Sequence, residues 1–91
     1  MQVIKGTNLV GSYGLAAIEV KCLSATNTKG TRLKAISQAG TLTVGRDYSL
    51  DWNDNAWEAA RALIEKLEWN GNWRMGHLVN GNVVFVREVT E

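Results

Sequence analysis

The chain has 91 residues, of which 45% are hydrophobic and 21% are charged, and its formal net charge is +1. These values predict one folded domain over residues 1–91, exclude an intrinsically disordered chain and argue against a general polyanion binder. No stretch approaches eighteen consecutive apolar residues and no secretion signal opens the chain, so we expect no membrane partner. The single cysteine, Cys22, lies in an apolar run, which predicts a buried thiol and a cytoplasmic location.

The first half of the chain is predicted to form an antiparallel meander. Residues 1–14 are a glycine-containing segment with two short apolar pairs, for which we expect one short strand at most. Apolar and charged residues alternate over 17–23, which indicates a strand with one buried and one charged face. After a polar turn at 27–30, Leu33 and Ala35 alternate with basic residues in a second strand, and a third is expected at 41–44. The connections are too short for parallel crossovers.

Residues 54–69, DNAWEAARALIEKLEW, have a different hydrophobic period, with apolar residues at intervals of three and four. The residues of this stripe are Ala56, Trp57, Ala60, Leu63, Ile64 and Leu67. The spacing predicts an amphipathic helix. We expect Asp54 or Asn55 to cap its first turn and Asn70-Gly71 to end it.

A terminal hairpin is predicted after the helix. Asn80-Gly81 separates two apolar runs, at 73–79 and 83–89, and this dipeptide is a strong signal for a hairpin turn. The expected order is therefore β-β-β-α-β-β. This order predicts an α+β fold, with a mostly antiparallel sheet and one amphipathic helix packed on one face.

The charges are unevenly distributed along the chain. Residues 1–46 hold six basic residues against Glu19 alone, a net charge of +5, whereas residues 47–91 hold four basic and eight acidic residues, a net charge of −4. This asymmetry predicts two surfaces of opposite charge. The acidic candidates for binding a partner are Asp51, Asp54, Glu58, Glu65 and Glu68.

The basic candidates belong to the hairpin within SATNTKGTRLKAI, residues 24–36. Lys21, Arg32 and Lys34 should project from one sheet face, next to a turn that holds Asn27 and Lys29. Amides, hydroxyls and cations at a turn can hold a phosphate backbone without reading bases. The alternative is that these residues provide solubility, because lysines on exposed strands discourage pairing between sheet edges.

Other chemistry has little support in the residues. The chain has one histidine, His77, and one cysteine, and neither has a recognisable catalytic context, so we expect no enzyme, catalytic residue, metal or cofactor. Among the tryptophans, Trp57 lies on the apolar helical stripe and is expected in the core. Trp52, Trp69 and Trp73 flank turns, where they either cover the helix ends or contact a partner.

Four motifs carry a resemblance to known sequences. They are NTKGTRLKA at 27–35, DYSL at 47–50, AARALIEKLEW at 59–69 and NVVFV at 82–86. Over residues 17–87 this set resembles small accessory proteins that are encoded on bacterial plasmids and phages. The group offers no catalytic motif to transfer. What the resemblance implies is a genetic context, that of a mobile element.

Three functions are compatible with these features. The leading interpretation is a non-enzymatic anti-defence protein of the anti-CRISPR or anti-restriction type. Such a protein would block a nucleic-acid-handling host defence complex by surface binding, through its acidic or its basic residues. The first alternative is a module that binds DNA or RNA by placing the basic hairpin on the phosphate backbone. The second is a homodimer or larger homo-oligomer that uses an open sheet edge and exposed tryptophans.

Overall fold

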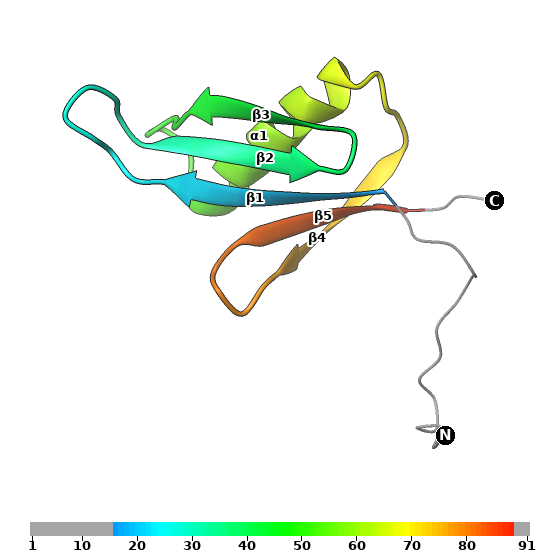
Figure 1. Cartoon of the computed structure of the whole chain (residues 1–91). Coiled ribbons are helices and arrows are strands. Elements are labelled where there is room, and N and C mark those ends of the chain that lie inside the picture. The colour runs from blue at the N-terminus through cyan, green and yellow to red at the C-terminus, as the bar shows by residue number, and fades with distance from the viewer. Residues whose placement is uncertain (1–15, 89–91) are drawn as a thin grey trace.

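The structure is a computed structural model that describes residues 16–88, so the short strand considered within residues 1–14 lies outside the described residues. Five strands and one helix follow in the predicted order β-β-β-α-β-β (Figure 1). Their bounds are β1 Ala17–Leu23, β2 Arg32–Ser37, β3 Gly40–Gly45, α1 Trp52–Lys66, β4 Asn72–His77 and β5 Val83–Glu88. The predicted α+β fold, with the helix packed against the sheet, is confirmed.

The five strands form one sheet in the spatial order β3-β2-β1-β5-β4, and all neighbouring strands are antiparallel. The predicted meander accounts for β1, β2 and β3. The terminal hairpin then places β5 beside β1, so β1 is the central strand and the first and last strands of the described chain are neighbours. In Figure 1 the helix lies against one face of this sheet.

The core lies between α1 and the sheet face that it covers. Its buried residues are Ile18, Val20, Leu33, Ala35, Ala56, Ala59, Ala60, Leu63, Ile64, Val83 and Phe85. Three of the helical residues are alanines, which allow the helix backbone to approach the strands closely. The ring of Trp57 packs on Phe85 at a centroid distance of 5.4 Å and an angle of 50°. The predicted apolar stripe of the helix therefore faces the core.

The helix begins earlier than its sequence suggested. Asp51, not Asp54 or Asn55, is the N-cap, and its Oδ1 accepts a hydrogen bond of 2.8 Å from the backbone N–H of Asp54. Asn55 is instead buried and joins the helix to the preceding loop. Its Oδ1 accepts from the N–H of Asp47, and its Nδ2 donates to the carbonyls of Asp47, Leu50 and Asp51 at 2.9–3.1 Å. The cap prediction was wrong because Asn55 bonds the loop rather than the helix start.

The helix also ends before the predicted Asn70-Gly71. Leu67 is the C-cap, and Glu68 adopts a positive φ of 57°. The N–H of Glu68 donates to the carbonyl of Glu65 at 3.1 Å, and the N–H of Trp69 donates to that of Ile64 at 3.0 Å. These two bonds form a Schellman motif in which a glutamate occupies the position that usually holds glycine. Sequence reasoning missed this end because it looked for a glycine.

Replacement of Asn55 by alanine should lower the free energy of unfolding by about 2–4 kcal/mol, because several backbone groups of the loop would lose their hydrogen bonds to this buried side chain. Urea denaturation followed by circular dichroism measures the loss. The matched control is Asn53→Ala, at an exposed position in the same turn, which should cost about 1 kcal/mol or less. Equal losses in the two variants would contradict this role of Asn55.

Replacement of Glu68 by glycine should raise the free energy of unfolding by about 0.5–1 kcal/mol. The left-handed backbone costs a residue with a Cβ atom about 1–2 kcal/mol, and the larger entropy that glycine loses on folding offsets part of this gain. Thermal and urea unfolding of the variant measure the difference. Glu68→Ala keeps the Cβ atom and removes the charge, so a similar gain in that control would show that charge, not conformation, is responsible.

Candidate functional site

The sheet has a second face, opposite the helix, which we call the open face because no element among residues 16–88 covers it. Strand register places Lys21 directly opposite Lys34 on this face, and Arg32 opposite Leu23. Lys21, Arg32 and Lys34 form what we call the basic row, and their side chains are half-buried along the sheet. The prediction that these three residues project from one sheet face is confirmed.

The basic row brings like charges close together. Directly opposed residues on antiparallel strands have Cβ atoms about 4.5–5.5 Å apart, and diagonal neighbours such as Lys21 and Arg32 lie about 7–8 Å apart. Like charges that are directly opposed, as Lys21 and Lys34 are, destabilise a sheet. Glu19 lies on the same face, two residues before Lys21, but its Oε2 accepts a hydrogen bond of 2.8 Å from Asn82 Nδ2. This bond occupies the carboxylate, and no ion pair joins it to the basic row among residues 16–88.

The loop between β1 and β2, residues 24–31, extends this face beyond the end of the sheet (Figure 1). Its tip is a tight turn in which the N–H of Thr26 donates to the carbonyl of Lys29 at 2.7 Å, and the N–H of Lys29 donates to the Thr26 hydroxyl at 3.1 Å. Asn27 and Thr28 form the tip between them. Both are exposed, as is Lys29. The loop thus places a cation and small hydrogen-bonding groups next to the basic row.

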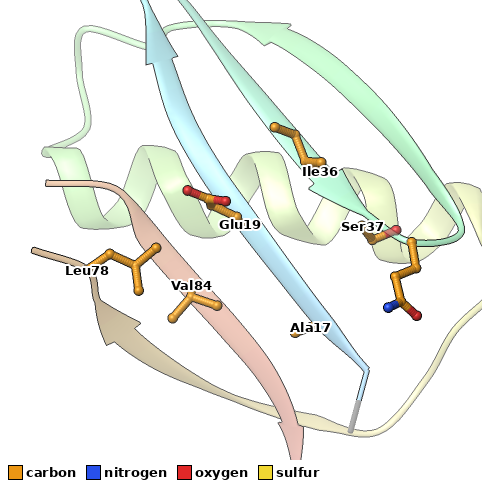
Figure 2. A pocket seen from close by; sticks show the side chains of 7 residues that line it. Ala17, Glu19, Ile36, Ser37, Leu78 and Val84 are labelled. Carbon is orange, nitrogen blue, oxygen red and sulfur yellow. The ribbon is translucent and has the colours of Figure 1, made fainter. Parts of the chain in front are cut away.

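The other half of the open face is largely apolar and carries a shallow hollow of about 420 Å³. In Figure 2 the side chains of Glu19, Leu78 and Val84 lie on the side of the strands away from α1. The hollow is lined by Ala17, Glu19, Ile36, Ser37, Gln38, Leu78 and Val84. Sequence reasoning did not identify this feature. Its signal was that β2 and β5 carry apolar residues, such as Ile36 and Val84, on the strand face expected to be polar.

The acidic candidates lie on or beside the helix, on the opposite side of the sheet from the basic row. Asp51, Asp54, Glu58, Glu65 and Glu68 are all exposed. Several have structural partners: Asp51 caps the helix, and Arg61 bonds both Glu58 and Glu65 at 2.7 Å. The hydrogen bond and charge of Glu58, with the charge of Glu65, raise the pKa of the Arg61 guanidinium. This pairing neutralises part of the acidic surface, whereas the cations of the basic row lack such a partner in the part of the chain described.

The tryptophans are mainly structural. Trp52, Trp69 and Trp73 are half-buried and pack against the core, and the rings of Trp69 and Trp73 stack with centroids 5.8 Å apart at 18°. These contacts agree with the interpretation that they cover the helix ends. Their use as contacts to a partner stays a prediction.

The two residues considered for catalysis are held in different surroundings. Cys22 is exposed, so the prediction of a buried thiol is wrong. It lies near the end of β1, beside a hollow of about 350 Å³ that Trp52 and Asn82 also line. His77 is exposed on β4, where its Nε2 is 3.1 Å from Oδ1 of Asn53.

Comparison with known proteins gives no match to a family model, a curated protein or a solved structure. The resemblance to accessory proteins of mobile elements therefore stays a prediction from the motifs. Within residues 16–88, no helix has the length and apolar character needed to cross a membrane.

Proposed function

We propose that this protein is a non-enzymatic module that binds the phosphate backbone of nucleic acid through the basic row and the loop 24–31. The observation that carries the proposal is the direct opposition of Lys21 and Lys34, with Arg32 on the diagonal. This arrangement opposes folding, and none of the ion pairs among residues 16–88 involves these three cations, so a bound polyanion would relieve the repulsion. Lys29 and the hydroxyl and amide groups of the tip extend the same surface.

The composition of the open face favours a double-stranded ligand. Bases of single strands are usually held by stacking on aromatic side chains. The strand residues that face outward from the described sheet, at alternate positions from Ala17 on β1 and Arg32 on β2, include no aromatic residue. A surface with cations and without stacking groups contacts phosphates and carries little base specificity. We therefore expect duplex binding with weak dependence on base sequence.

The acidic helix surface supports a second candidate, which is an anti-defence inhibitor. Exposed carboxylates at Asp54 and Glu68, with those of Glu58 and Glu65, would occupy the basic groove of a nucleic-acid-handling complex. The mobile-element resemblance is consistent with such a role. It ranks second because Arg61 and the helix cap engage part of this charge. A chain that binds no polyanion but retains such a complex from a host lysate would reverse the ranking.

Replacement of Lys29, Arg32 and Lys34 together by alanine should weaken duplex binding at every base sequence. Each lost phosphate contact lowers the slope of log affinity against log salt by about 0.9, so the slope should fall by about two to three. Fluorescence anisotropy with labelled duplexes and single strands, at several salt concentrations, measures both effects. Lys66→Ala, which removes a cation on the helix, is the control and should leave the slope unchanged. An unchanged slope in the triple variant would refute the proposal.

Replacement of Lys34 by glutamate should change stability and binding in opposite directions. The new carboxylate would lie opposite Lys21 and replace repulsion by attraction, so the free energy of unfolding should rise by up to about 1 kcal/mol, whereas duplex affinity should fall about tenfold or more. Urea denaturation and anisotropy measure the two quantities. Lys34→Gln removes the charge alone and should give a smaller change in each. Loss of stability with unchanged affinity would show that Lys34 serves the fold rather than a ligand.

A further inference from the structure

The two edges of the sheet differ in how they are protected against pairing with a strand of another chain. At the β3 edge, Lys66 on the helix donates from Nζ to the backbone carbonyl of Thr41 at 3.0 Å. This bond blocks an outward-facing acceptor with a charged side chain, a device that discourages pairing with another chain. At the β4 edge the charged residue Arg74 turns inward, and its Nε donates to Oε2 of Glu88 on the neighbouring strand at 2.6 Å. Among residues 16–88, no side chain protects the outward-facing backbone of β4 in this way.

The hydrogen bonds of the final hairpin show which backbone groups of β4 point outward. The N–H of Leu78 donates to the carbonyl of Asn82 at 2.8 Å, so Leu78 faces β5. Backbone direction alternates along a strand, and Trp73, Met75 and His77 therefore direct their N–H and C=O groups away from the sheet. These three residues provide evenly spaced donors and acceptors along the edge.

Exposed apolar side chains lie on β4 and in the turn that follows it. The large hydrophobic residues that are exposed among residues 16–88 are Tyr48, Met75, Leu78 and Val79. Three of them lie on β4 or directly after it, and Met75, at the centre of the strand, is 42% exposed. Within the part of the chain that the structure describes, the outward-facing backbone groups of β4 have no hydrogen-bond partner, and an exposed edge of this kind with an apolar side chain is a template for strand pairing.

We propose that a second copy of this chain pairs with β4 in an antiparallel dimer, with Met75 opposite the partner's Met75 and Trp73 opposite the partner's His77. A two-fold axis perpendicular to the sheet gives antiparallel pairing and keeps both helices on one side. In this register the residues whose backbone groups point away from the sheet, Trp73, Met75 and His77, pair only with one another. In this register the exposed Met75 side chains meet on the axis and Arg74 lies beside a glycine, and these contacts favour a second copy over an unrelated peptide.

A second register, in which the two-fold axis passes between the two copies of Arg74 instead of the two copies of Met75, is disfavoured by charge. It would place Arg74 opposite the partner's Arg74, and like charges directly opposed destabilise paired strands. In the proposed register Arg74 lies opposite the partner's Gly76, whose missing side chain leaves room for the guanidinium. Gly76 has a further reason to remain small, because a Cβ atom there would come within 3.3 Å of Val84 Cγ1.

The dimer would enlarge the proposed nucleic-acid-binding surface, but the inference of the dimer does not depend on that function. The two-fold axis joins the sheets of both copies into one ten-stranded sheet, and both open faces lie on the same side. Two basic rows would then face one ligand. Self-association needs no nucleic acid, however, so it is measured independently, and either proposal can fail alone.

Multi-angle light scattering and sedimentation velocity test the dimer with the full chain across micromolar to millimolar concentrations. The expected mass is about 20 kDa, twice the 10.0 kDa of one chain. Met75→Lys should give the mass of one chain with an unchanged circular dichroism spectrum, because two lysines would oppose each other on the axis. Thr43→Lys places the same charge at an outward-facing position of the β3 edge and should remain dimeric. A wild-type chain that stays near 10.0 kDa throughout would overturn the proposal.

A cross-link tests the register separately and does not depend on a disruptive variant. In a Cys22→Ser background, Met75→Cys should form an intermolecular disulfide when oxidised glutathione accepts the electrons of the two thiols. Hydrogen-bonded antiparallel partners have Cα atoms about 5.5 Å apart, within the range of a disulfide. Thr43→Cys in the same background should remain monomeric on a non-reducing gel. Equal cross-linking of the two variants would overturn the β4 pairing.

Discussion

The pairing of β5 with β1 is the interaction on which the rest of the structure depends. It makes β1 the central strand, with β2 on one side and β5 on the other. Ile18 lies opposite Phe85 and Val20 opposite Val83, so the buried residues of both strands face the helix. A slip of one residue would turn these side chains toward solvent. The same register fixes the open face, since Glu19 and Lys21 occupy the alternate positions.

The open face carries like charges in directly opposed positions. A sheet face exposed to solvent can carry charges of either sign, and alternating signs would stabilise it. Here Lys21 faces Lys34, while the nearby carboxylate of Glu19 is held by Asn82. On the helix, by contrast, Arg61 joins two glutamates. On the open face itself Arg74 also pairs with Glu88, whereas no ion pair of the basic row occurs among residues 16–88. This contrast is the observation on which the proposed phosphate-binding surface rests.

Local patterns were sufficient to predict most of the elements. Alternation of apolar and charged residues located β1 and β2, the helical period located α1, and Asn80-Gly81 located the final hairpin. The same alternation placed the basic row on one face. The position of β5 beside β1 was not predictable in this way, because no local signal selects which edge of a meander a distant hairpin joins. The helix ends and the exposed Cys22 also depended on tertiary contacts, which set where Asn55 bonds and how far the helix covers β1.

Parts of the sheet remain uncovered because the described chain has one helix for five strands. A helix is about 10 Å wide, whereas five strands at a spacing of about 4.8 Å span about 19 Å, so one helix cannot shield the whole of one face. Trp69 and Trp73 stack beside the helix end and fill part of this gap, but Met75 remains exposed. A second copy across β4 would place another Met75 against it. With one helix for five strands, residues 16–88 leave both the β4 edge and the open face uncovered. Met75 is exposed at the edge, while the open face carries the basic row beside an apolar hollow.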